Sequence, residues 1–351
     1  MEIILEKWKI PFATCFVLIS ISTTNARESI VPCKAETHAE LNKLERKYEL
    51  DGIRIFYTEQ APTTGADHRL PAVSLLDTNG NGVSDFIENI AKQADVARRA
   101  YNLLGFRDPL DSAKYRAVEK IDINILNMEY NGLAYHVPVS YPTAPNRGDD
   151  CTLRIDISSR LELTRPFTTG WNVALHEMFH IFQYGQTNFK RSWVNEPLAT
   201  WAEFVFRVND FFPLDAAYSL PTMKTTFQND IIANPNSAMA YRFWSRLIDL
   251  IDVPANNLRL PASLPNEKYT DGQPVFKDQS SRCAALVSKL YQSFGAEDNV
   301  VSYQNGLNPY NWPAADKTSP AHDDRLLRTI QEAVRHTGIS NPELNSFLQI
   351  Q

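Results

Sequence analysis

In several segments of the first half of the chain, apolar residues follow the two-residue repeat of a β-strand. Ile53 to Thr58 is a run of β-branched and aromatic residues of strand length. From Ile121 to Met128, isoleucines alternate with polar residues, which predicts a strand with one buried face. Gly132 to Ser140 and Thr152 to Ser158 have a similar character. Together these segments predict a mixed sheet.

Other segments follow the longer repeat of a helix. Phe86 to Leu104 presents apolar residues on one face, and Gly105 follows at a position that often ends a helix. Glu36 to Leu50 has apolar residues at helical spacing among charges, which predicts an amphipathic surface helix. In the last third of the chain, helical spacing recurs in Ser280 to Phe294, Asp323 to Thr337 and Asn341 to Gln351.

These patterns predict an α+β fold. Residues 254 to 278 are rich in Pro and Asn and separate the sheet-forming part of the chain from its helical last third. We therefore expect a domain over residues 27 to 253 that contains a mixed-sheet lobe. A mainly helical C-terminal region is expected over residues 254 to 351.

The segment from Asn172 to Gly185, NVALHEMFHIFQYG, combines helical periodicity with candidate metal ligands. Leu175, Met178 and Phe182 form an apolar stripe, which predicts a buried helix of about four turns. Gly185 falls where such a helix commonly ends. The polar residues of the segment would then share the opposite face of the helix.

His176, Glu177 and His180 form an HExxH motif in this segment. Residues i and i+4 share a helix face, so both imidazoles can reach one zinc ion. The alternative is a core helix whose histidines make ordinary hydrogen bonds. Burying two histidines and a carboxylate on one face without partners is costly, and this cost favours zinc binding by His176 and His180.

A second helical segment, SWVNEPLATWAEFVF, follows after a short loop. Glu196 opens this segment and is the candidate third zinc ligand, with Pro197 in the first turn. Glu203 lies seven residues later on the same face, where its carboxylate can orient a ligating imidazole. The alternative for Glu196 is an ordinary carboxylate at a helix N-terminus.

Residues 77 to 88, DTNGNGVSDFIE, fit the twelve-residue calcium loop of the EF-hand type, with Gly82 at the sharp turn. Residues 70 to 76 have the character of a strand, so this loop stands alone rather than in a paired sensor. Weak binding suited to extracellular calcium is expected, and an Asn- and Gly-rich turn is the alternative. The predicted oxygen donors are Asp77, Asn79, Asn81, Val83, Asp85 and Glu88.

The N-terminus has the features of a secretory signal peptide. Lys7 and Lys9 precede an apolar run from Ile10 to Ile21, and small residues up to Ala26 mark a cleavage position. The apolar run is too short for a stable bilayer span, and an uncleaved anchor is the alternative. We therefore expect a secreted or periplasmic protein from which residues 1 to 26 are removed.

Removal of the signal peptide would leave three cysteines, Cys33, Cys151 and Cys283. They allow at most one intramolecular disulfide, and their spacing does not identify the pair. Cys33 lies near the new terminus and is a candidate to fasten the N-terminal segment. No pair has CxxC spacing, which argues against zinc ligation by cysteine.

The charge of the chain limits its partners. The formal net charge is −6, and long basic runs are absent from the sequence, which argues against nucleic-acid and anionic-membrane partners. Beyond the N-terminus, the sequence has no stretch long and apolar enough to insert stably into a membrane.

Together the motifs resemble those of the gluzincin zinc metallopeptidases, in which HExxH is followed by a second helix with a glutamate ligand. The resemblance runs through HEMFHIFQYG and WVNEPLATWAEF. More narrowly, residues 50 to 250 are similar to a group of secreted bacterial metalloproteases that share the strand, the calcium-type loop and both helical motifs. Pro197 departs from the small residue usual after the ligand glutamate, and the C-terminal third lies outside the resemblance.

The resemblance implies a zincin-like fold and hydrolysis of peptide bonds. His176, His180 and Glu196 would bind zinc, and Glu177 would act as general base toward a zinc-activated water. Tyr241, in a following helical segment, is the candidate donor to the oxyanion, with a core aromatic as its alternative.

The leading expectation is a secreted zinc endopeptidase that acts on peptide or protein substrates, with calcium as a structural ion. An alternative from another class is a calcium-stabilised extracellular binding or adhesion protein with an inactive zinc site. A third alternative is an enzyme with a peptidase fold that acts on a non-peptide amide substrate.

Overall fold

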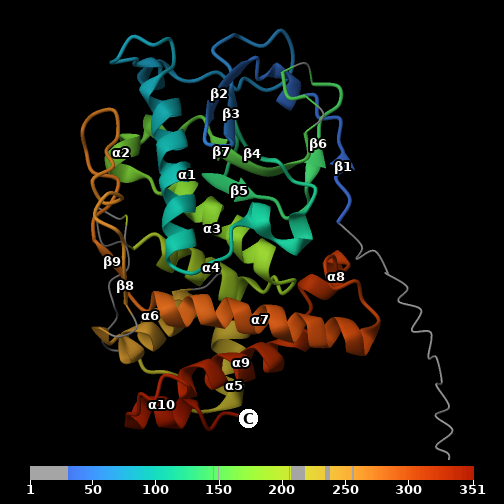
Figure 1. Cartoon of the computed structure of the whole chain (residues 1–351), viewed down its shortest axis with the longest axis vertical. Coiled ribbons are helices and arrows are strands. Elements are labelled where there is room, and N and C mark those ends of the chain that lie inside the picture. Colours follow the sequence, from blue (N-terminus) through green and yellow to red (C-terminus); the bar gives the residue numbers. More distant parts are fainter. Residues whose placement is uncertain are drawn as a thin grey trace, which may run out of the picture.

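A seven-stranded mixed sheet forms one half of the molecule, and helices form most of the other half (Figure 1). This computed structural model describes residues 31–144, 146–148, 150–204, 206, 218–233, 238–254 and 257–351. The expected signal peptide, residues 1–26, lies outside the described residues. The mixed α/β architecture and the mixed sheet confirm the fold expected from the sequence at this level.

The sheet contains β1 (Lys34–Ala35), β2 (Arg46–Leu50), β3 (Ile53–Tyr57), β4 (Lys120–Leu126), β5 (Gly132–Ala134), β6 (Val139–Ser140) and β7 (Thr152–Ser158). Its centre is parallel, because β3 pairs with β4 and β4 with β7 in the same direction. β2 pairs antiparallel with β3, while β5 and β6 pair antiparallel with β7. The predicted strand over residues 132–140 is therefore two short strands.

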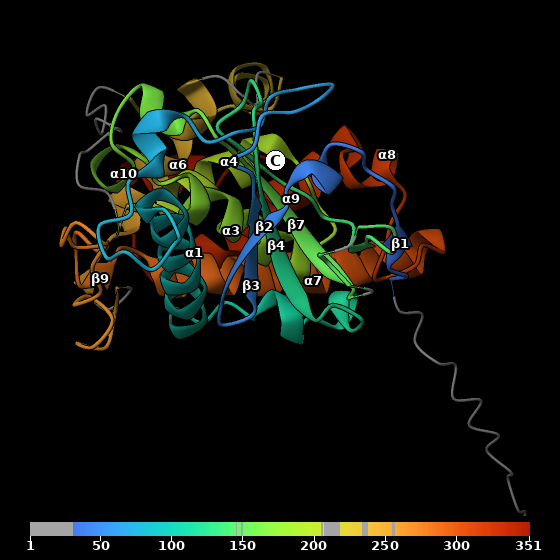
Figure 2. The ribbon, with the colours of Figure 1, turned by 90° about the horizontal axis from the view of Figure 1, so that it is seen from above.

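Both faces of the central strands are buried. Isoleucines of β3, β4 and β7 face α1 (Asp85–Leu103) and α3 (Val173–Gln186), which lie on one side of the sheet (Figure 2). The other face carries polar residues, yet Asp122 and Asn124 are 0% exposed. The prediction of one exposed face for residues 121–128 is wrong, because apolar residues of the loops on this side, among them Leu41 and Tyr141, pack over it.

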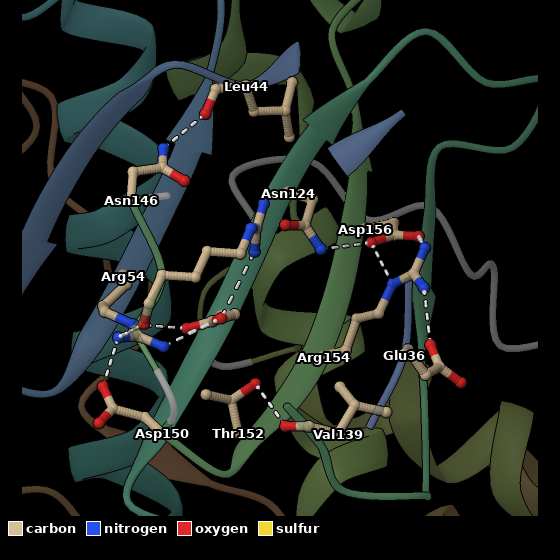
Figure 3. Close-up of polar contacts among 12 residues, drawn as sticks. Glu36, Leu44, Arg54, Asn124, Val139, Asn146, Asp150, Thr152, Arg154 and Asp156 are labelled. Carbon is tan, nitrogen blue, oxygen red and sulfur yellow. Dashed lines mark hydrogen bonds and ion pairs between the residues drawn. The ribbon is translucent and has the colours of Figure 1, made fainter. Parts of the chain in front are cut away.

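Paired charges fill this outer face (Figure 3). Arg54 on β3 donates to Asp122 Oδ1 at 2.7 Å and to Asp150 Oδ2 at 2.6 Å. On β7, Arg154 donates to Asp156 Oδ2 at 2.6 Å. We call these five residues the outer ionic network. Each of its carboxylates accepts hydrogen bonds from an arginine, which offsets part of the cost of burying the charges.

The helices α1 and α3 cross the inner face of the sheet. α1 ends as predicted, because Gly105 follows its C-cap with a φ of +89°. The sequence had indicated that α3 ends at Gly185, but the helix continues through this residue to Gln186. Other helices of the described residues are α2 (Phe167–Gly170), α4 (Ser192–Ala202), α5 (Lys224–Thr226), α6 (Ala238–Ile251), α7 (Ala284–Asn305), α8 (Ala314–Lys317), α9 (Asp323–Arg335) and α10 (Pro342–Phe347).

The last third of the chain is mainly helical, as expected. α7, α9 and α10 lie below the sheet in Figure 1, and the short strands β8 (Leu258–Arg259) and β9 (Ser280–Ser281) precede α7. In the segment expected to be an irregular boundary, Tyr269 and Val275 are buried in the same hydrophobic cluster as Ile53 of the sheet. Within the described ranges, no helix has the length and apolar character needed to cross a bilayer.

Two local predictions are wrong. Residues 36–50 do not form a helix, because Leu41 and Leu44 belong to a short 3-10 turn and residues 46–50 pair with β3 as β2. The helical spacing of these apolar residues arises from two elements that bury them in different clusters. Residues 72–75 form a 3-10 helix rather than the expected strand.

The disulfide joins Cys33 to Cys151. Cys33 precedes β1 and Cys151 precedes β7, so the bond fastens the N-terminal segment to the sheet. This pairing agrees with the role proposed for Cys33 and resolves the choice that the spacing left open. Cys283 is a buried free thiol.

Candidate metal centre

The helix α3 presents one apolar face to the core and one polar face to a cleft. Leu175, Met178 and Phe182 are 0% exposed, as their spacing predicted. Tyr101 of α1 packs edge-on against Phe182 with ring centroids 5.4 Å apart. This packing fixes the rotation of α3 about its axis, and so directs its histidines away from the core.

Three ligand atoms meet at the polar face of α3. His176 Nε2 and His180 Nε2 are 3.1 Å apart, and each is 3.4 Å from Glu196 Oε2. A tetrahedral zinc ion with bonds of about 2.0–2.1 Å places its ligand atoms about 3.3 Å apart. The predicted ligands therefore form a triangle of the size that zinc requires, and they form the one such group of metal-binding side chains among the described residues.

Two further side chains orient the imidazoles. His176 Nδ1 lies 2.8 Å from Glu203 Oε1, and His180 Nδ1 lies 2.7 Å from Gln183 Oε1. The Gln183 amide nitrogen donates to the Asn195 carbonyl at 2.9 Å, so its oxygen is turned to His180. In both pairs Nδ1 is the donor, which leaves the lone pair of each Nε2 directed to the centre.

Glu203 was expected in this role from the sequence, whereas Gln183 was missed. Gln183 follows His180 by three residues, one turn further along α3. This spacing places the two side chains on neighbouring positions of the helix surface. It was the available signal, but the amide orientation also depends on Tyr291 of α7, whose hydroxyl accepts from Gln183 Nε2 at 2.7 Å.

The sequence had indicated that Glu196 opens its helix, and this prediction is wrong. α4 begins at Ser192, and Pro197 lies inside it. A proline inside a helix leaves the carbonyl four residues earlier without its usual donor. Here the indole of Trp244 on α6 donates to the Trp193 carbonyl at 2.8 Å, which satisfies that oxygen. The proline is thus accommodated, and Glu196 sits one full turn within α4.

Glu177 points to the same cleft from beside the triangle. Its carboxylate accepts a hydrogen bond from the Ala134 backbone N–H of β5. A Cβ on Gly132 would lie 2.7 Å from Glu177 Oε1 and 2.6 Å from Val173 Cγ2. A glycine at position 132 therefore allows β5 to approach α3 closely enough to hold Glu177.

The charges of the centre are strongly coupled. Burial lowers the pKa of His176, but its hydrogen bonds with Glu196 and Glu203 outweigh this effect and raise that pKa to about 10. Burial raises the pKa of Glu196, but both histidines outweigh it and hold that pKa well below the usual range. Burial raises the pKa of Glu177, against the opposing effect of the two histidines. The centre therefore favours a cation between its ligands, whether a proton or a metal ion.

Two of the three candidate ligands, His176 and Glu196, line a cleft of about 440 Å³. Residues 130–132 beside β5 and residues 165 and 168–173 before α3 form its walls, together with His176, Glu177, Glu196 and Glu203. This volume falls within the ~300–1,000 Å³ typical of ligand sites.

Tyr241 and His136 do not line this cleft. Tyr241, on α6, lies beside Thr200 behind α4, where burial chiefly raises its pKa to about 12. Its role as oxyanion donor remains a prediction. His136 packs edge-on against Tyr184 at 5.9 Å.

The predicted calcium loop has a compact, hydrogen-bonded turn. The Asp77 carboxylate accepts from the backbone N–H groups of Gly80, Asn81 and Gly82 at 2.8, 3.2 and 2.8 Å. The side-chain amides of Asn79 and Asn81 donate to the two Glu88 carboxylate oxygens at 2.9 and 2.8 Å. These hydrogen bonds join the side chains of Asn79 and Asn81 to Glu88, and that of Asp77 to the backbone of the turn.

The two other predicted donors of the loop are arranged differently. Asp85 accepts from the Thr78 hydroxyl at 2.5 Å and lies at the start of α1. Val83 donates its backbone N–H to Asn81 Oδ1 at 2.9 Å. Calcium binding by the loop remains a prediction.

The cleft combines a His, His, Glu triangle, a neighbouring carboxylate and an adjacent strand edge. Such an arrangement is suited to a divalent metal and to proton transfer beside it. Comparisons with protein-family models, with curated proteins and with solved structures find no match to this chain.

Proposed function

We propose that this protein is a zinc-dependent peptidase with a zincin-like fold. The observation that carries the proposal is the triangle of His176 Nε2, His180 Nε2 and Glu196 Oε2, with edges of 3.1, 3.4 and 3.4 Å. All three atoms present lone pairs to one point when the Nδ1 protons are held by Glu203 and Gln183. Two imidazoles and one carboxylate form a donor set typical of catalytic zinc.

Zinc bound at this triangle would polarise a carbonyl and lower the pKa of a water molecule. Glu177 is the carboxylate that can accept the proton of this water, because it lines the cleft beside the ligands without belonging to the triangle. Burial raises its pKa, which brings a carboxylate closer to the range useful for a general base. Glu177 would then pass the proton to the leaving amine.

A strand edge beside the centre supports a peptide substrate. Among the described strands, β5 pairs only with β7, in the register Leu133 opposite Asp156. In an antiparallel pair, alternate residues turn their backbone groups away from the partner. The backbone groups of Gly132 and Ala134 therefore turn away from β7 and toward Glu177, which already accepts the Ala134 N–H. An extended peptide can add to such an edge through main-chain hydrogen bonds.

The proposal is tested by metal content and by one conservative substitution. The parent protein, loaded with zinc and freed of excess metal, should hold one zinc per chain and cleave peptides of a mixed library. Glu177→Gln should keep the zinc and the thermal midpoint but lose about 10²- to 10⁴-fold in kcat/KM, because only the basic oxygen is removed. A zinc-loaded parent that cleaves no peptide would favour the binding-protein alternative or a non-peptide amide substrate.

We further propose that calcium occupies the loop from Asp77 to Glu88 as a structural ion. The support is the turn in which the Asp77 carboxylate accepts three backbone N–H groups, with Glu88 closing the loop. We also propose that the protein is secreted or periplasmic. The Cys33 to Cys151 disulfide supports it, because structural disulfides persist mainly in oxidising compartments.

A further inference from the structure

A second cavity, of about 1000 Å³, lies between the C-terminal ends of α1 and α3 and the helix α7. Among the described residues, it shares no lining side chain with the cleft of the candidate metal centre. Its volume reaches the upper end of the ~300–1,000 Å³ typical of ligand sites. The cavity is therefore large enough for a small organic ligand, and its lining residues indicate the chemistry of that ligand.

Lys114 is a buried cation in the lining of this cavity. It is 7% exposed, and its ammonium group donates to Asp298 Oδ2 at 3.4 Å. Burial lowers the pKa of Lys114 to about 8, although Asp298 opposes this effect. The long contact with Asp298 is the one hydrogen bond of the ammonium group within the described part of the chain. An ammonium group carries three N–H donors, so two of them have no acceptor there.

The neighbouring carboxylates are already engaged or exposed. Asp298 also accepts from a backbone N–H of the loop between α3 and α4 at 2.6 Å. Asp108, which lines the cavity as well, accepts from Arg98 Nε at 2.7 Å. Asp111 and Arg107 are exposed lining residues of opposite charge, so their charges offset each other. The lining carboxylates therefore compensate the charge of Lys114 only in part.

Two more buried lysines lie near Lys114. Lys317 is 5% exposed and donates to Asn311 Oδ1 at 2.8 Å. Lys190 places its side-chain nitrogen 3.8 Å from the centre of the Tyr184 ring, and this buried nitrogen has no hydrogen-bond partner among the described residues. Burial lowers the pKa of Lys190, and the charges of Lys317 and Lys114 lower it further. The interior on this side of the molecule thus holds an excess of basic groups.

Gln186, at the end of α3, supplies a second unmatched donor. It lines the same cavity, and its amide nitrogen is buried without a hydrogen-bond partner among the residues that the structure describes. Buried polar groups in folded proteins are nearly always hydrogen-bonded. Lys114 and Gln186 therefore call for an acceptor, and the excess of buried basic groups favours an acceptor that is negatively charged.

We propose that the second cavity binds the oxyanion group of a small molecule, either a carboxylate or a phosphate, with Lys114 and Gln186 as its donors. Both groups combine a negative charge with several acceptor oxygens, and they form charge-assisted hydrogen bonds with N–H donors. The ligand supplies the negative charge that the chain itself does not place beside Lys114. The inference goes beyond the proposed peptidase function and is independent of it, because no ligand of the candidate metal centre lines this cavity.

The test compares two anions with a neutral molecule. The zinc-loaded protein is titrated calorimetrically with inorganic phosphate, with succinate and with succinamide, the uncharged diamide of succinate, at constant ionic strength. At least one of the anions should bind about 10- to 100-fold more tightly than succinamide, because a charged acceptor forms the stronger hydrogen bonds. The preference between phosphate and succinate identifies which of the two groups the site recognises.

Two variants locate the binding at this cavity. Lys114→Met combined with Asp298→Asn removes both charges of the pair and leaves no unpaired buried carboxylate. Its affinity for the anions should fall to that for succinamide. Ala296→Trp, at an exposed lining position of α7, should also weaken anion binding about 10-fold or more, because the indole occupies the cavity while Lys114 is unchanged. Val300→Trp is the matched control on the same helix, since Val300 is 42% exposed and lies outside the lining.

A third variant separates this site from the candidate metal centre. His180→Ala should bind the anions as tightly as the parent, because His180 is remote from the lining of the second cavity. Anion binding that disappears in His180→Ala would instead assign it to bound zinc and overturn the inference. Equal binding of succinate and succinamide, binding of neither anion, or anion binding that persists in both cavity variants would also overturn it. A zinc-loaded parent that cleaves peptides but binds no anion keeps the proposed function and removes this inference alone.

Discussion

Buried charges lie on both sides of the central sheet, in the outer ionic network and at the candidate metal centre beside α3. In the network, Arg54 presents donors to Asp122, and both side chains are buried. At the metal centre, His180 Nε2 and Glu196 Oε2 meet at 3.4 Å with His176 Nε2 as the third atom. When both Nδ1 atoms carry protons, all three of these atoms are acceptors.

The two clusters differ in whether their charged groups are paired with one another. The network is complete without a ligand, because its positive and negative groups belong to the chain itself. The centre is completed by a cation, since acceptors that face one another repel unless a positive charge lies between them. A charged cluster is thus a candidate ligand site when its own donors and acceptors do not match.

The largest expected effect on stability comes from breaking the network. Asp122→Asn keeps the shape of the side chain but removes the buried carboxylate that pairs with both Arg54 and Arg147, and it leaves Arg54 with only the partly exposed Asp150 as a charged partner. The free energy of unfolding should fall by about 3–5 kcal/mol, measured by urea denaturation, while zinc content stays at the parent level. Asp150→Asn is the matched control. The Asp150 side chain is 34% exposed, so its loss should cost less than about 1 kcal/mol. Equal effects of the two variants would contradict the importance of burial.

The disulfide joins the segments that precede β1 and β7. Replacing both Cys33 and Cys151 by serine opens a link between residues separated by 118 positions. We expect a loss of about 3 kcal/mol in the free energy of unfolding, because the unfolded chain gains freedom. Zinc content should not change. Reducing agent should lower the thermal midpoint of the parent and leave that of the double variant unaltered; a shift in both would point to another cause.

His180→Ala tests the candidate metal centre. The metal-free variant should be only slightly less stable than the metal-free parent, because Glu196 keeps His176 as a partner when His180 is removed. In the parent, free zinc at 100 times its dissociation constant should add about 2.7 kcal/mol to the free energy of unfolding. The variant should lack this gain together with peptide cleavage. A zinc-dependent shift of the thermal midpoint that survives in His180→Ala would place zinc elsewhere.

A smaller effect is expected from the group that orients the second imidazole. Gln183→Leu removes the acceptor of the His180 Nδ1–H. Zinc affinity, measured by competition with a chelator, should fall about 10- to 100-fold. Gln186→Leu is the control in the same helix, because the Gln186 amide nitrogen has no hydrogen-bond partner among the described residues. If both variants bind zinc alike, Gln183 does not position the ligand.

The smallest effect concerns the calcium loop, which lies at the surface away from both clusters. With a dissociation constant of about 1 mM, about 10 mM calcium should stabilise the folded protein by about 1.4 kcal/mol. Asp77→Ala should abolish this gain, because Asp77 anchors the turn through three backbone N–H groups. Thermal melts with calcium and with magnesium provide the measurement. Identical melting curves of the parent with and without calcium would contradict calcium binding by this loop.

Local spacing in the sequence determined the parts of this protein that a single helix or strand can contain. His176 and His180 share a helix face by their four-residue separation, and the apolar stripe of α3 is buried as that periodicity predicts. The strands β3, β4 and β7 were also recognised, because their β-branched runs have one dominant interpretation. The same local reasoning failed for residues 36–50, where a few apolar residues at helical spacing belong to a turn and a strand.

Tertiary structure decided everything that depends on contacts between elements. The distance from Glu196 to the histidines follows from the packing of α4, whose internal Pro197 is tolerated because α6 supplies an indole donor. Cysteine spacing allowed three pairings, and only the approach of the N-terminal segment to β7 selected Cys33 with Cys151. The alternating pattern of β4 likewise did not reveal that its outer face is buried. A polar residue on a strand can be exposed to solvent, or buried and paired when loops cover it, and the sequence pattern is the same in both cases.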